Sequence, residues 1–149
     1  MSVRFLVDTN ILSAAAPSKA QVPAGLLEWM DRHSARLYMS VVTVAEIEDG
    51  IAKLQREGAS RKATDVGEWM ETLIHLYSAR ILPFDLGAAR LAGKLSDTAR
   101  ARGHTPGFAD LAIAATAEHH DLTILTRNLK HFAPLGVDAH DPVAELPVE

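Results

Sequence analysis

Short apolar runs alternate with longer segments of helical periodicity along the chain, and this alternation is the feature that most restricts its fold. The apolar runs are Val3–Val7, Leu37–Val42, Ile81–Phe84 and Leu122–Leu125, with Gly136–His140 as a candidate fifth. The helical segments are Ile11–Ala16, Ala24–His33, a helix starting at Thr43, one ending near Tyr77, Leu86–Arg102 and Ala109–Ala117. Such an order is typical of a mostly parallel sheet covered by helices on both faces. We therefore predict a three-layer α/β/α fold.

Length and composition set further limits. The 149 residues, 48% of them hydrophobic, fit a single domain over residues 1–149 that buries a substantial core, with Pro17–Pro23 as a polar linker. The absence of cysteine excludes disulfides and thiolate metal sites. A formal charge of −4 provides no overall basic field, so contact with nucleic acid would depend on local basic groups or bound cations. Asp8 and Asn10 interrupt the apolar N-terminal stretch, and no run is long enough to span a membrane, so we expect a cytoplasmic protein.

Four polar side chains fall at the ends of the predicted strands or beside them. Asp8 ends the first strand, and Glu46 lies in the first turn of the helix after the second. Asn128 follows the fourth strand, and Asp110 opens the helix that leads into that strand. Open parallel sheets bind ligands outside the carboxyl ends of their strands. If the first and fourth strands are neighbours, these four residues converge on one edge.

Each acid also fits a purely structural role at the start of a helix. Asp8 can cap the next helix, Thr43–Glu46 matches a capping box, and Asp110 can complement a helix dipole. Asp110 is the exception that we single out, because Ala109–Ala117 is otherwise apolar on nearly every face and a carboxylate there needs a compensating charge. Three acids without a basic partner would repel one another, and a divalent cation would relieve that repulsion.

The available ligands favour a hard cation. Carboxylate oxygens suit Mg²⁺, which keeps several waters when it binds to proteins. Zinc is disfavoured because the chain has neither cysteine nor an HExxH motif, and His119–His120 is interpreted as a dipole contact at a helix end. The sequence shows no Ser-His-Asp or Cys-His arrangement that would activate a side chain as a nucleophile. We therefore predict that the nucleophile of the site is a water activated by the metal.

Four segments resemble, in order, the motif blocks of a known family. They read VDTNIL, VAEIEDGI, ADLAIAATA and LTILTRNLKHF. Together they are similar to the PIN-domain ribonucleases, and within these to the VapC and FitB-type toxins of bacterial toxin–antitoxin pairs. The resemblance extends from Val3 to about Pro142 and includes the intervening RILPFD.

The resemblance implies a PIN-like α/β/α sandwich with a parallel sheet in the order 3-2-1-4-5, and an endoribonuclease that depends on Mg²⁺ or Mn²⁺. Its metal-binding acids would be Asp8, Glu46 and Asp110. Many members have a fourth acid where this chain has Asn128, so we assign Asn128 a catalytic role toward a water or a hydroxyl rather than toward the metal. Supporting roles fall to Thr9, Asn10, Thr126 and Arg127.

The resemblance also implies partners. We expect an RNA substrate, cut to leave a 5′-phosphate and a 3′-hydroxyl, and a homodimer held inactive by a small VapB-like antitoxin in a larger hetero-oligomer. Basic residues near the motifs are candidates for guiding RNA, although a solvated charged face is the better explanation for all but Arg127: Arg100, Arg102, His104, Arg127 and Lys130. Apolar residues that could line an antitoxin groove, or belong to the core, are Trp29, Met30, Trp69 and Met70.

Two other functions remain open. A PIN-like module that binds RNA or a protein without cutting is favoured by the missing fourth acid and disfavoured by the three acids that are present. A phosphoacceptor receiver domain also combines an α/β fold with acids and Mg²⁺. Its acidic pair, its middle-strand aspartate and its late lysine have no counterpart here apart from Asp85, so we rank it last.

Overall fold

The computed structural model describes residues 2–16 and 23–148, so the predicted linker lies outside the described residues apart from Pro23. One parallel sheet forms the centre, with the strand order β3-β2-β1-β4-β5. The strands are β1 (Phe5–Val7), β2 (Leu37–Ser40), β3 (Ile81–Leu82), β4 (Thr123–Leu125) and β5 (Ala139–His140). The order implied by the family resemblance and the fifth strand are both confirmed.

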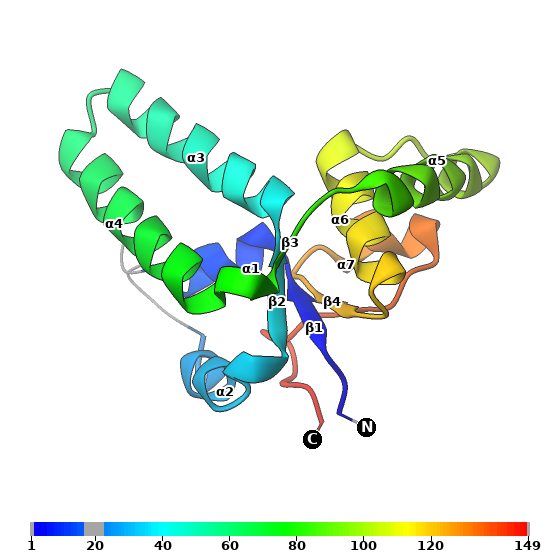
Figure 1. The fold of residues 1–149 in the computed structure, drawn as a ribbon, viewed down its shortest axis with the longest axis horizontal. Coiled ribbons are helices and arrows are strands. Elements are labelled where there is room, and N and C mark those ends of the chain that lie inside the picture. The colour runs from blue at the N-terminus through cyan, green and yellow to red at the C-terminus, as the bar shows by residue number, and fades with distance from the viewer. Residues whose placement is uncertain (1, 17–22, 149) are drawn as a thin grey trace.

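Helices cover both faces of this sheet (Figure 1). On one side lie α1 (Thr9–Ala14), α2 (Leu26–Arg32), α3 (Val41–Arg56) and α4 (Ser60–Tyr77), and on the other α5 (Leu86–Ala101), α6 (Phe108–His119) and α7 (Leu129–Phe132). Side chains of β1 alternate between two cores, with Phe5 and Val7 in one and Leu6 in the other. Strands buried on both faces explain why the strand segments read as continuous apolar runs. The predicted three layers are confirmed.

The junction between β2 and α3 differs from the prediction. The sequence pattern predicts a strand to Val42, but β2 ends at Ser40 and α3 begins at Val41. The hydroxyl of Ser40 accepts a hydrogen bond from the N–H of Val42 at 3.0 Å and so caps the helix. Thr43 is therefore a buried residue of the first turn. The capping-box interpretation of Thr43–Glu46 is wrong.

Among the helices on the α5–α7 side of the sheet, α6 is the most buried. Every residue from Leu111 to Ala117 is buried, as the apolar sequence predicts. Asp110 lies in the first turn, ahead of this stretch, and its side chain is 31% exposed. The expectation that its carboxylate is embedded in apolar surface is wrong, because the helix starts beyond the edge of the sheet. Within the described ranges, no helix combines the length and apolarity needed to cross a membrane.

Candidate active site

Asp8 follows β1 directly and is only 6% exposed. Its Oδ1 accepts a hydrogen bond from the N–H of Thr9 at 2.8 Å, so the residue does cap α1. Its Oδ2 accepts a second bond from the hydroxyl of Thr126, also at 2.8 Å, and its own N–H donates to the carbonyl of Leu125 at 2.9 Å. The carboxylate is thus fixed between the ends of β1 and β4, and capping is only part of its role.

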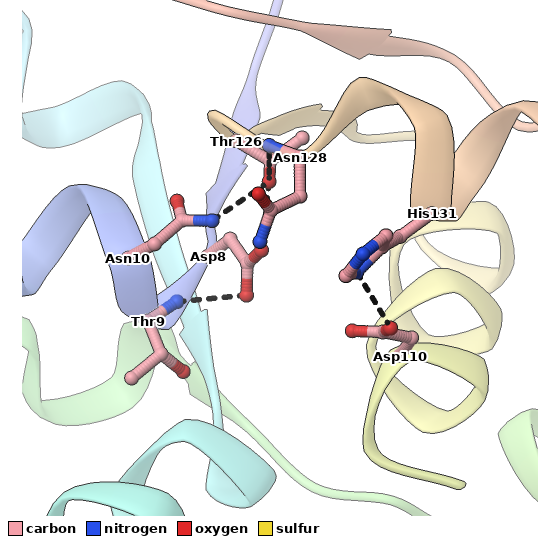
Figure 2. A network of polar contacts seen from close by, with 7 residues as sticks. All are labelled: Asp8, Thr9, Asn10, Asp110, Thr126, Asn128 and His131. Carbon is pink, nitrogen blue, oxygen red and sulfur yellow. Dashed lines mark hydrogen bonds and ion pairs between the residues drawn. The ribbon is translucent and has the colours of Figure 1, made fainter. Parts of the chain in front are cut away.

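Thr126 connects the segments that follow β1 and β4, and it is completely buried. Besides donating to Asp8, its Oγ1 accepts from the Asn10 amide at 3.2 Å and from the N–H of Asn128 at 3.0 Å. The Asn10 carbonyl oxygen in turn accepts from the N–H of Arg127 at 3.2 Å. Figure 2 shows these side chains gathered at one edge of the sheet. With Thr9, which donates its N–H to Asp8, all four predicted supporting residues are therefore parts of one hydrogen-bond network.

Glu46 reaches the same edge from α3. Its Oε1 accepts a hydrogen bond from the hydroxyl of Thr9 at 2.7 Å, and the Oγ1 atoms of Thr9 and Thr43 lie 3.1 Å apart. Because a threonine hydroxyl has one proton and two lone pairs, Thr9 can donate to Glu46 and accept from Thr43. Thr9 therefore touches the Glu46 carboxylate with its side chain and the Asp8 carboxylate with its N–H.

Asp110 approaches from the second helical layer. Its Oδ2 lies 3.2 Å from Nδ1 of His131 in α7, and Figure 2 shows the two side chains facing each other. Sequence analysis did not identify His131, and the premise that the acids lack a basic partner is wrong for Asp110. A signal was available, since His131 lies within the segment LTILTRNLKHF that resembles a family motif block.

The electrostatics of Asp8 reveal how near the other acids are. Burial raises the pKa of its carboxyl above the ordinary value, hydrogen bonds from Thr126 and Thr9 lower it, and the negative charges of Asp110 and Glu46 raise it again. All three predicted acids are therefore close enough to interact. Among the residues that the structure describes, no three acids or histidines are grouped tightly enough to form a complete metal site. The donor set, carboxylate oxygens beside amide and hydroxyl groups, fits a hard cation that keeps part of its water.

The predicted basic residues lie in different surroundings, and only some of them are near the acids. Arg100 lies 3.9 Å from Asp97 on the exposed face of α5, and Arg102 donates to the carbonyl of Pro134 at 3.1 Å. His104 and Lys130 instead line a hollow that also borders Asp110. The two pairs of large apolar residues divide as well. Trp29, Met30 and Met70 belong to the core, and Met30 also lines, together with the partly buried Trp69, a groove of about 410 Å³.

Comparison with known proteins agrees with this architecture. Residues 5–134 match the model of the PIN domain family. The chain therefore belongs to the PIN domain family.

Within that family, the chain is similar to the VapC and FitB proteins. It is 34% identical to VapC ribonuclease Y4jK of Sinorhizobium fredii, over 93% of this chain and 96% of the relative. It is 33% identical to Toxin FitB of Neisseria gonorrhoeae, over 93% and 97%. The crystal structure of FitAcB from Neisseria gonorrhoeae matches with a TM-score of 0.81 at 33% identity, over 93% of this chain and 97% of that one. The resemblance seen in the sequence is confirmed.

Proposed function

We propose that this protein is the endoribonuclease toxin of a toxin–antitoxin pair and that it hydrolyses RNA phosphodiesters with Mg²⁺ or Mn²⁺. The observation that carries the proposal is the buried carboxylate of Asp8, which is held by two hydrogen bonds and lies within electrostatic reach of Glu46 and Asp110. A fixed, partly desolvated carboxylate beside two further acids is costly unless a cation compensates it. The similar proteins named ribonuclease and toxin support the same activity.

The residues of this chain have distinct roles in the proposal. A carboxylate offers about four lone-pair positions. Asp8 uses two of them for Thr9 and Thr126 and keeps the others for a cation. Glu46 and Asp110 face solvent and are suited to hold the cation or its waters. A divalent ion bound there would supply the Lewis acidity that activates water and neutralises charge on the phosphoryl oxygens. Thr9 and Thr126 are positioning residues, because they act through the carboxylates that they contact.

Partners follow from the similar assemblies. The FitAB structure bound to an IR36 DNA fragment matches with a TM-score of 0.82 at 32% identity, over 97% of both chains. On this proposal the chain forms a homodimer that a VapB-like antitoxin holds inactive in the cytoplasm, where its RNA substrate is found.

Purified protein and single-stranded RNA provide the direct test. We expect cleavage with Mg²⁺ or Mn²⁺ that leaves 5′-phosphate ends and stops when EDTA removes the ion. Cleavage that continues undiminished after thorough chelation and dialysis contradicts the metal mechanism. RNA binding without any cleavage, in the presence of either ion, supports the non-cutting module instead.

Growth of bacteria provides the test of the toxin role. Expression of the chain alone should arrest growth, and coexpression of its antitoxin should relieve the arrest. A variant that carries both Asp8→Asn and Asp110→Asn is the control, because it keeps the protein surface almost unchanged. Normal growth with soluble wild-type protein at high level contradicts the toxin role without bearing on cleavage in vitro.

A further inference from the structure

A hollow of about 260 Å³ lies next to the acid cluster. It is lined by the loop 104–107, by Lys130 and His131 of α7, and by Pro134. Asp110 also lines this hollow, so the hollow opens directly beside the candidate active site. We refer to it as the Lys130 pocket.

The walls of the Lys130 pocket are fixed to the end of one helix. Arg102, just after α5, donates to the carbonyl of Pro134 at 3.1 Å, which ties this lining residue to the end of α5. The N–H of His104 donates to the carbonyl of Ala99 at 2.9 Å, which ties the loop to the same helix. Between these contacts Gly103 has a φ of 80°, a conformation that glycine adopts at no steric cost. The pocket is therefore formed by the fold itself and does not depend on a ligand for its shape.

The charges around the pocket favour an anion. Lys130 is exposed and, in the described part of the chain, forms no ion pair. The carboxylate of Asp110, which would repel an anion, is in contact with His131. The described residues that line the pocket include no Phe, Tyr or Trp; the aromatic rings there are the imidazoles of His104 and His131, and that of His131 contacts Asp110. Lys130 supplies the positive charge that a phosphate requires.

We propose that the Lys130 pocket binds a backbone phosphate of the RNA strand, next to the phosphate that is cut, with Lys130 as its principal contact. The inference rests on the proposed function, because Asp110 belongs both to the pocket and to the acid cluster. A strand whose scissile phosphate lies at Asp8 and Asp110 has further phosphates on both sides of the cut, and the pocket that Asp110 lines is adjacent to that position. Phosphate contacts of this kind position a strand without reading its sequence.

Binding of RNA in EDTA tests the proposal without any cleavage. Lys130→Gln should weaken binding of single-stranded RNA roughly tenfold, as expected for a lost hydrogen bond to a charged group. The slope of log K against log[salt] should become shallower by about 0.7, the value for one phosphate contact on a single strand. Lys94→Gln is the matched control, since Lys94 is an exposed lysine of α5 on the side opposite the buried Ala92. Equal affinity and equal slope for Lys130→Gln and wild type would overturn the proposal.

A second measurement locates the contact on the RNA. Single phosphates around the cut position are replaced, one at a time, by uncharged methylphosphonates. The effect of Lys130→Gln should vanish for one replacement beside the cut position and persist for the others, because the two changes then remove the same interaction. An effect that persists for every replacement means diffuse attraction and overturns the pocket. If wild-type protein neither binds nor cuts RNA, the proposed function fails too, whereas cleavage with no change in Lys130→Gln contradicts this inference alone.

Discussion

On the β1 side of the candidate site, Asp8 is 6% exposed and both of its carboxylate oxygens accept hydrogen bonds. On the α6 side, the side chain of Asp110 is 31% exposed, and its Oδ2 lies 3.2 Å from Nδ1 of His131, whose side chain is 44% exposed. The first carboxylate accepts hydrogen bonds from a backbone N–H and a hydroxyl, and the second contacts an imidazole that is itself exposed to water. Sequence position alone makes the two acids look equivalent, since each lies at the start of a helix.

These different surroundings imply that Asp8 is a fixed ligand for a cation, whereas Asp110 can change its contact partner. Removing a buried donor leaves a polar group unsatisfied, which costs far more than removing one partner of an exposed ion pair. Asp8 therefore keeps its position whatever is bound. Asp110 can exchange its contact with His131 for a bound cation at little cost in free energy. We expect substitutions on the two sides to reduce catalysis alike but to change the stability of the protein differently.

The largest effect should be on RNA cleavage, and substitutions on the β1 side and on the α6 side should reduce it equally. Asp8→Asn and Asp110→Asn should each reduce the rate of RNA cleavage on the order of a thousandfold, because each removes a charge that stabilises the loaded site by several kcal/mol. Initial rates with Mn²⁺ measure this. Asp97→Asn, on the exposed face of α5, is the control and should retain wild-type activity. Full activity of either site variant removes that acid from the proposed mechanism.

The next effect should be on stability, and it should appear only on the β1 side. Thr126→Val keeps the shape of the side chain but deprives Asp8, Asn10 and Asn128 of their shared partner. Leaving buried polar groups unsatisfied should lower the free energy of unfolding by about 2–3 kcal/mol, measured in urea without metal. Thr72→Val is the control, because Thr72 is exposed on α4 and bonds only within its helix, and it should stay within about 0.5 kcal/mol of wild type. A Thr126 variant as stable as this control would mean that the network does not hold Asp8.

A smaller effect, on the pH dependence of the free energy of unfolding, should follow from the raised pKa of Asp8. In metal-free protein the folded state keeps the Asp8 proton to a higher pH than the unfolded chain does. Stability from this group is therefore greatest below the ordinary value of 3.8 and falls as the pH rises through the folded pKa. Asp8→Asn cannot titrate, so the difference in unfolding free energy between variant and wild type should shift in favour of the variant as the pH rises from about 4 to 7. Urea unfolding at several pH values checks this, with Asp97→Asn as the control for loss of one charge, and a difference independent of pH contradicts it.

Much of the fold was predictable because it depends on local patterns. Apolar runs mark the buried strands, and helical periodicity marks the layers around them. The positions of the acids at the strand ends followed from the same patterns, because parallel strands end at one edge. The strand order did not follow from these patterns and came from the resemblance to a family.

The parts that could not be predicted depend on contacts between distant side chains. The bonds of Thr126 to Asp8 and Asn10 join residues more than a hundred positions apart, and no local pattern encodes them. The burial of Asp110 was misjudged for a related reason. The apolar composition of α6 correctly predicts burial from Leu111 onward, but it does not reveal that the first turn extends past the sheet edge toward His131. The cap at Ser40 was missed because Val41 and Val42 favour strands in isolation.

The smallest effect should be on stability on the α6 side. It tests the difference between the two sides most sharply, because the free energy of unfolding should hardly change when Asp110 loses its contact with His131. His131→Gln removes the ion pair with Asp110 but leaves the N–H of residue 131 bonded to the carbonyl of Asn128. Exposed ion pairs contribute about 0–1 kcal/mol, so the free energy of unfolding without metal should change by less than about 1 kcal/mol. If Asp110 exchanges partners freely, the stabilisation that Mn²⁺ gives by binding only the folded state should be at least as large in the variant as in wild type. Melting temperatures with and without Mn²⁺ measure both quantities. A loss comparable to that of Thr126→Val would show that His131 holds Asp110 as rigidly as Thr126 holds Asp8, and the distinction between the two sides would then be wrong.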